Sequence, residues 1–127
     1  MPNSQTMTPL EWEIMKLFWK QGKTSIRKIA DKLPESYQRA YTTIQTYVER
    51  LVDKGLLKKE KKGKINLYEP AIREQTALHH ETESFVKRAF NGSFSRLSGY
   101  LIKSGKLSED EIEELQLLID HYREKKS

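Results

Sequence analysis

The chain has 127 residues, no cysteine and a formal net charge of +5. This length suits one ordinary domain or two small modules, and the missing cysteines exclude a disulfide framework, a thiol nucleophile and a thiolate metal site. No apolar run approaches the roughly 20 residues that span a bilayer, and the first residues lack the basic and apolar regions of a signal peptide, so we expect a cytoplasmic protein without direct membrane binding.

The charge is distributed unevenly along the chain. Residues 1–72 contain 14 lysines and arginines against 8 acidic residues, whereas residues 73–127 contain 9 against 10. A basic module that binds a polyanion, joined to a neutral module, has this asymmetry. A solvated lysine-rich surface explains the charge alone equally well.

The first predicted helix begins in "MTPLEWEIMKLFWK". Thr8 is its expected N-cap, Pro9 its first residue, and Glu11 completes a capping box in which each side chain satisfies a free backbone N–H. Gly22 is its expected end. Trp12 and Trp19 fall on or beside its apolar stripe, so we interpret them as core residues.

Two further helices are predicted before residue 56. "TSIRKIADKLP" indicates a short helix that Thr24 or Ser25 caps and Pro34 ends. After a loop, "RAYTTIQTYVERLVDKGLL" predicts a third helix that ends at Gly55. The apolar stripe of this third helix follows the helical period and contains Ile44, Tyr47, Val48 and Leu51.

The opposite face of the third helix is polar. It carries Arg39, Thr42, Thr46, Glu49, Arg50 and Asp53, with Thr43 and Gln45 on its flanks. Threonines are mediocre helix formers, so a merely solvated face would not need them. Such side chains can read hydrogen-bonding edges, although a threonine-rich face seen alone is more often plain surface. Tyr41, which precedes the apolar stripe, is a further candidate for such contacts.

After the third helix the hydrophobic period changes from 3.6 to 2. Leu57, Ile65 and Leu67 are the apolar strand positions of a predicted hairpin, whose turn is "KKGK". Residues 58–64 hold five lysines and one glutamate, a pattern that also occurs where lysines protect a sheet edge from aggregation. Three helices followed by a basic hairpin predict a winged helix-turn-helix, in which the third helix enters the major groove and the wing lies along the backbone of double-stranded DNA.

Residues 73–127 are predicted to be helical. Asn91 and Gly92 end a first helix, Gly99 weakens a second one, and Ser108 with Glu111 forms the capping box of a third. These helices carry more apolar surface than one short chain covers, which favours a homodimer that places two recognition helices on a palindromic site. The expected dimerisation residues are Phe85, Leu97, Leu101, Ile112, Leu115, Ile119 and Tyr122.

The predicted fold class is therefore mainly α with a small β-hairpin wing. A winged helix-turn-helix DNA-binding domain at residues 1–72 precedes a helical dimerisation domain at residues 73–127. We expect no enzyme activity and no cofactor. The sequence has no catalytic set of nucleophile, base and orienting residue at a recognisable spacing, and it has no glycine-rich phosphate loop. A regulator with a small-molecule pocket is the alternative.

A metal site is weakly suggested in the C-terminal part. His79 and Glu83 lie four residues apart on one predicted helix face, with His80 beside them and His121 further along the chain. Two ligands do not make a complete site and this spacing recurs by chance. We therefore interpret these residues as exposed polar side chains and expect no bound metal.

The sequence resembles the penicillinase and methicillin-resistance repressors over nearly its whole length. "TPLEWEIMKLFW", "TTIQTYVERLVDKGLL", "AFNGSFSRL" and "LSEDEIEEL" carry this resemblance. It implies a dimeric winged-helix transcriptional repressor that binds operator DNA. The DNA-binding residues that it implies are Thr42, Thr43, Gln45, Thr46 and Arg50 in the recognition helix and Lys61, Lys62 and Lys64 in the wing.

Two differences from the family pattern concern specificity and induction. Gln45 stands where well-known members have arginine, and an amide prefers adenine edges whereas arginine prefers guanine. In the antibiotic-responsive members, a membrane-bound sensor protease cuts an Asn-Phe bond; the matching position is Tyr100-Leu101, after Gly99. The resemblance implies cleavage in this region. The copper-responsive branch is excluded because it binds metal through cysteines.

Overall fold

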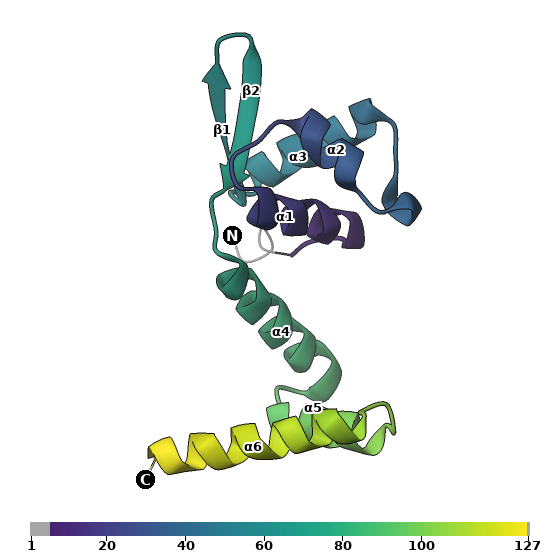
Figure 1. The fold of residues 1–127 in the computed structure, drawn as a ribbon, viewed down its shortest axis with the longest axis vertical. Coiled ribbons are helices and arrows are strands. Elements are labelled where there is room, and N and C mark those ends of the chain that lie inside the picture. The colour runs from purple at the N-terminus through teal and green to yellow at the C-terminus, as the bar shows by residue number, and fades with distance from the viewer. Residues whose placement is uncertain (1–5, 127) are drawn as a thin grey trace. The chain divides into compact units, whose positions relative to one another are not determined.

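The computed structural model describes residues 6–126; residues 1–5 and 127, which the expected domains include, lie outside that range. The elements of the described range follow the predicted order (Figure 1). They are α1 (Pro9–Gln21), α2 (Ile26–Lys32), the 3-10 helix η2 (Glu35–Tyr37), α3 (Tyr41–Asp53), β1 (Leu57–Lys62), β2 (Ile65–Pro70), α4 (Glu74–Phe90), α5 (Phe94–Lys103) and α6 (Glu109–Lys126). The predicted winged-helix class, mainly α with one hairpin, is confirmed.

The chain divides into two compact units, and the division falls between Thr82 and Glu83. This position lies inside α4. The first unit contains α1 to α3, the hairpin and the first part of α4, and the second contains the rest of α4 with α5 and α6.

The predicted helix caps of the first unit are confirmed. The Glu11 backbone N–H donates to Thr8 Oγ1 at 3.2 Å, and the Thr8 N–H donates to Glu11 Oε1 at 2.9 Å. Of the two candidates for the cap of α2, Ser25 accepts from the Lys28 N–H. Thr24 instead pairs its backbone with Tyr68, through two hydrogen bonds of 2.8 and 2.9 Å. The loop before α2 is thereby joined to β2.

Helix α3 packs its apolar stripe against α1 and α2. Ile44, Val48 and Leu51 are completely buried, and Tyr47 is half-buried against the same core. Gly55 follows the helix with φ +82°, a left-handed conformation that costs glycine little because it has no Cβ. The stripe and the end of this helix agree with their prediction.

The hairpin pairs β1 and β2 in antiparallel register, with Lys59 opposite Tyr68. Leu57 is buried as expected, but Ile65 is 60% exposed and the buried residue of β2 is Tyr68. Alternation along the strand places Tyr68 on the face opposite Ile65 and Leu67. Tyr68 fills the inner face because its ring packs near Phe18, with ring centroids 6.4 Å apart, while its hydroxyl reaches a polar partner.

The second unit consists of the helices that its capping signals predict. Asn91 and Gly92 adopt positive φ after α4. Ser93 caps α5, and the Ser108–Glu111 capping box opens α6 with hydrogen bonds of 3.0 and 3.1 Å. Within residues 6–126, no helix is both long and apolar enough to traverse a bilayer.

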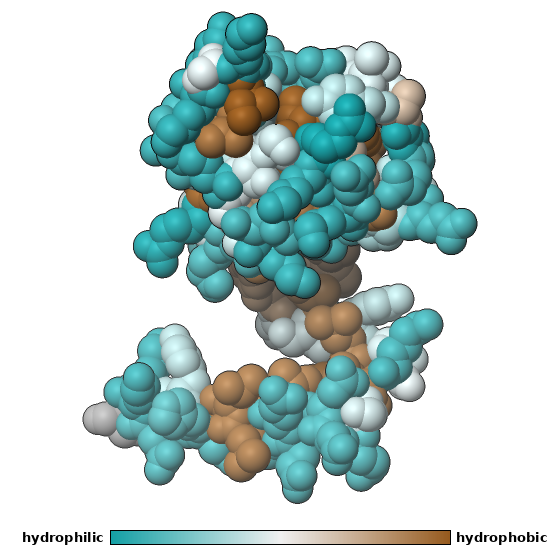
Figure 2. All heavy atoms as spheres, turned by 45° about the horizontal axis from the view of Figure 1, so that its top comes forward, coloured by the Kyte–Doolittle hydropathy of each residue, from teal (hydrophilic) through white to brown (hydrophobic). Residues whose placement is uncertain are grey.

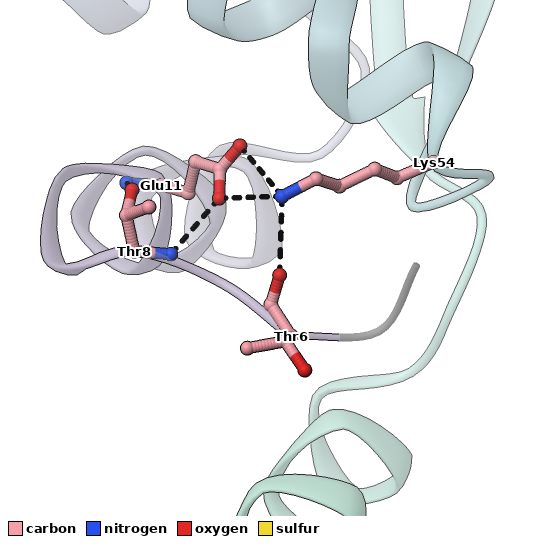
Figure 3. Close-up of polar contacts among 4 residues, drawn as sticks. All are labelled: Thr6, Thr8, Glu11 and Lys54. Carbon is pink, nitrogen blue, oxygen red and sulfur yellow. Dashed lines mark hydrogen bonds and ion pairs between the residues drawn. The ribbon is translucent and has the colours of Figure 1, made fainter. Parts of the chain in front are cut away.

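A buried ion pair links the start of α1 to the residue after α3 (Figure 3). Lys54 Nζ lies 2.8 and 3.0 Å from the two carboxylate oxygens of Glu11 and 3.1 Å from the Thr6 carbonyl oxygen. The Glu11 side chain is 2% exposed and that of Lys54 28%. Because Glu11 also completes the cap of α1, its carboxylate fixes two segments that are 43 residues apart.

This ion pair predicts an unequal response to two substitutions. Lys54→Met should lower the free energy of unfolding by about 2 to 3 kcal/mol, somewhat below the roughly 3 to 5 of fully buried pairs, because Lys54 remains partly in water. Adding Glu11→Gln removes the stranded charge and keeps an acceptor for the Thr8 N–H. The double variant should therefore be more stable than Lys54→Met in urea unfolding at pH 7. A double variant that is less stable would contradict this interpretation.

Candidate nucleic-acid interface

The outward face of α3 is polar and accessible. Thr42, Gln45, Thr46 and Arg50 are exposed, and Thr43 is half-buried. By the helical period, Thr42, Thr46 and Arg50 lie on the side away from the buried stripe, and Thr43 and Gln45 flank it. Because the buried stripe prevents rotation of the helix, these side chains form a fixed surface.

Two of these side chains have local contacts that limit their conformations. The Thr46 hydroxyl donates to the Thr42 carbonyl oxygen at 3.0 Å, which leaves its lone pairs and methyl group for an external partner. The Arg50 guanidinium carbon lies 5.3 Å from the centre of the Tyr47 ring. A cation over an aromatic face is stabilised by the ring quadrupole, so Arg50 is partly oriented before it meets any ligand.

The charged residues of the hairpin differ in their contacts. Lys59 is bound to Glu49 at 3.0 Å, and Glu60 is bound to Lys23 of the loop before α2, whereas Lys58 is exposed. Lys61, Lys62 and Lys64, the predicted wing residues, are exposed around the turn at Gly63 and form no salt bridge among residues 6–126. The turn end of the hairpin therefore retains a net positive charge.

Glu49 connects α3 to the hairpin, a role that the sequence did not indicate. Its Oε2 accepts hydrogen bonds from the Tyr68 hydroxyl at 2.6 Å and from Lys59 Nζ at 3.0 Å. Tyr68 lies 19 residues from Glu49, so no local pattern reveals the pair. The carboxylate thus contacts the hairpin instead of standing unpaired among the polar side chains of α3.

The pKa shifts of this pair follow from its contacts. Partial burial raises the pKa of the Glu49 carboxyl, but hydrogen bonds from Tyr68 and Lys59 and the Lys59 charge outweigh it, so the pKa lies below its ordinary value. Burial and the bond to Glu49 raise the pKa of the Tyr68 phenol well above its ordinary value. Near neutral pH, Glu49 is ionised and Tyr68 donates to it.

The predicted dimerisation residues lie in the second unit, and most of them are exposed. Leu97 is half-buried, while Phe85, Leu101, Ile112, Leu115, Ile119 and Tyr122 are 39 to 61% exposed. Each described residue of α6 is exposed. Hydrophobic residues run along the C-terminal helices in Figure 2, and Leu117 and Leu118 add to those that the sequence singled out.

The predicted cleavage region lies inside α5. Gly99 is half-buried, whereas Tyr100 is 62% and Leu101 46% exposed. Helical backbone does not fit the extended strand that proteases bind, but a glycine in a helix interior lowers helix stability by about 1 kcal/mol relative to alanine. The exposed chain around Gly99 therefore unwinds more readily than a regular helix.

The histidines of the metal hypothesis lie exposed on helices. His79 and His80 are exposed on α4, with ring centroids 6.0 Å apart. Among residues 6–126, the structure brings no three potential metal ligands of the histidine, cysteine or carboxylate type together.

Comparison with known proteins identifies the family. Residues 7–121 match the penicillinase repressor family. The chain belongs to this family. It is 29% identical to the penicillinase repressor of Bacillus licheniformis, across 91% of each chain, and 28% identical to the methicillin resistance regulatory protein MecI of Staphylococcus aureus, across 87% of this chain and 89% of MecI.

A solved structure supports the same fold. The solution structure of the DNA-binding domain of the repressor BlaI is 31% identical and has a TM-score of 0.51, covering 58% of this chain and 90% of that domain. The family match confirms the resemblance noted in the sequence, and the BlaI domain supports the winged-helix fold.

Glu49 predicts a pH-dependent contribution to stability. Because its folded-state pKa is lowered, the contribution is present above the unfolded pKa of about 4.3 and is lost as pH falls through the folded value. Glu49→Gln should lower the free energy of unfolding by roughly 1 kcal/mol at pH 7. The difference from the unsubstituted protein should shrink below about pH 4 in urea titrations.

Glu35→Gln provides the control for this titration, since Glu35 is exposed and forms no salt bridge among the described residues. A Glu49→Gln difference that stays constant from pH 7 to pH 3, or one that the control reproduces, would show that the carboxylate charge is not involved.

Proposed function

We propose that this protein is a transcriptional repressor that binds double-stranded operator DNA as a homodimer. The observation that carries the proposal is the outward surface of α3, where Thr42, Gln45, Thr46 and Arg50 are accessible while Ile44, Val48 and Leu51 of the same helix are completely buried. A helix of this kind fits the major groove, where amide, hydroxyl and guanidinium groups distinguish base pairs. Membership of the penicillinase repressor family supports it.

Base reading and backbone binding would be divided between α3 and the wing. Gln45 is suited to an adenine edge, because its amide can both donate and accept there, and Arg50 can reach a phosphate or a guanine. Lys61, Lys62 and Lys64 are suited to phosphates, since their charges have no salt-bridge partner among residues 6–126. Phosphate contacts add affinity on any sequence, whereas base contacts select one. The proposed activity is binding, without catalysis.

This division predicts different effects for two sets of substitutions. Replacing the three wing lysines with alanine should weaken binding to a selected duplex and to an unrelated one alike, and should reduce the slope of log K against log salt by about 0.9 for each phosphate that is no longer neutralised. Gln45→Ala should instead lower discrimination at one base pair by about 1 to 3 kcal/mol with little change in slope. Fluorescence anisotropy with duplexes recovered from a random pool measures both quantities.

A matched control removes the same charge elsewhere in the first unit. Lys20, Lys28 and Lys32 are exposed, form no salt bridge among the described residues and lie outside α3 and the hairpin, so their replacement with alanine should change the salt slope less than the wing variant does. If both lysine sets changed the salt slope equally, the wing lysines would not be the phosphate contacts. If Gln45→Ala and the wing variant had the same effects on slope and discrimination, the division between base reading and backbone binding would be wrong.

The helices of the second unit would form the dimer. Each described residue of α6 is exposed, and Ile112, Leu115, Ile119 and Tyr122 recur at the spacing of a helix-pairing stripe. Pairing with a second copy removes such a stripe from water. A two-fold dimer places two copies of α3 on two half-sites, and the second contact then adds by effective concentration.

Release from DNA would occur when a membrane-bound sensor protease cuts near Gly99. A cut between Tyr100 and Leu101 removes the end of α5 and the whole of α6 from the DNA-binding unit. The chain that remains should lose the affinity contributed by the dimer while it retains an intact α3 and wing.

A protein that ends at Tyr100 tests the dimer and the consequence of cleavage together. We expect it to sediment as a monomer where the full chain is a dimer, and to bind a palindromic site roughly 100-fold more weakly but a half-site equally well. Undiminished affinity for the palindrome would contradict dimerisation through these helices. Mass mapping of the full chain after incubation with its sensor locates the cut, and derepression with an intact chain would favour control by a small ligand.

A further inference from the structure

A groove of about 350 Å³ lies between α2, the start of α3 and β2. Its lining includes Arg27 from α2, Tyr41 and Gln45 from α3, and Lys64 and Asn66 from the hairpin. The groove therefore joins the proposed base reader, Gln45, to a predicted wing residue, Lys64. Arg27 was not among the residues that the sequence pattern indicated.

The groove carries a net positive charge. Arg27 and Lys64 contribute one charge each, and no aspartate or glutamate is among the lining residues. Neither cation forms a salt bridge within the described part of the chain, whereas the nearby Lys23 and Lys59 are bound to carboxylates. Within the groove lining, Arg27 and Lys64 therefore remain open to an anion.

Arg27 is held in place by an aromatic ring. Its guanidinium carbon lies 4.4 Å from the centre of the Tyr41 ring, closer than in the Arg50–Tyr47 pair. Stacking stabilises the cation and restricts its rotamers, while the guanidinium edge remains able to donate two parallel hydrogen bonds to a phosphate. A side chain that is ordered before binding loses less entropy when it binds.

We propose that Arg27 and Lys64 hold one phosphate of the DNA backbone in this groove, and that Tyr41 positions Arg27 for it. This inference rests on the proposed DNA-binding function. A phosphate fixed beside Gln45 sets the register in which the Gln45 amide meets a base, since backbone contacts orient a protein on the duplex. Tyr41 then acts through Arg27, which differs from the direct DNA contact expected from the sequence.

Four variants of the full chain test the clamp by fluorescence anisotropy at several salt concentrations. Arg27→Ala should weaken binding about fivefold on the selected and the unrelated duplex alike, and should lower the salt slope by about 0.9. Tyr41→Phe, which keeps the ring, should bind as the unsubstituted protein does. Tyr41→Ala should weaken binding to nearly the same extent as Arg27→Ala, and the double alanine variant should bind no more weakly than Arg27→Ala alone.

Lys32→Ala is the matched control, because Lys32 is exposed on the same helix but does not line the groove. Arg27→Ala with an unchanged salt slope, effects of Arg27→Ala and Tyr41→Ala that add, or an equal effect of Lys32→Ala would each overturn the clamp. Failure of the unsubstituted protein to bind any duplex would instead reject the proposed function. Thermal unfolding of each variant distinguishes a local change at the groove from unfolding of the first unit.

Discussion

Burial of the apolar stripe of α3 is the constraint on which the proposed DNA interface depends. Ile44, Val48 and Leu51 are fully buried, and each such side chain contributes about 1.5 to 3 kcal/mol when it leaves water. Rotating α3 about its axis would expose all three, so the helix is fixed in one orientation. With 3.6 residues per turn, the same orientation directs Thr42 and Thr46 outward. The outward surface is thus a consequence of the core.

Polar contacts then hold the two ends of α3 and join the helix to the hairpin, which burial of the apolar stripe alone does not do. Lys54, after the helix, is bound to the buried Glu11 of α1. In the middle of the helix, Glu49 holds the Tyr68 hydroxyl, and at its start the Tyr41 ring carries Arg27. These contacts depend on distance and angle, whereas hydrophobic burial is non-directional, and each joins α3 to a different element. The proposed base reader and its neighbouring cations consequently belong to one compact first unit.

The sequence predicted the features whose signals are local. Thr8 with Glu11 and Ser108 with Glu111 marked helix starts, and Gly55 marked an end, because caps are satisfied within three or four residues. The contacts of Glu49 could not be predicted, since they depend on a fold that brings Tyr68 next to α3. Period-2 alternation showed a strand but not which face is inner, and Tyr68 occupies the buried position instead of Ile65. The resemblance to the penicillinase repressor family directed attention to α3 and the wing, yet Arg27 emerged only from the groove.

Backbone amide chemical shifts of the labelled protein, followed by NMR during titration with a selected duplex, test most directly whether α3 presents its polar face to DNA. If it does, the largest changes fall on residues 41–50 and on the hairpin turn at residues 61–64, and they disappear in high salt. Changes confined to residues 83–126, or none at low ionic strength, would contradict the assignment of α3 as the reading element.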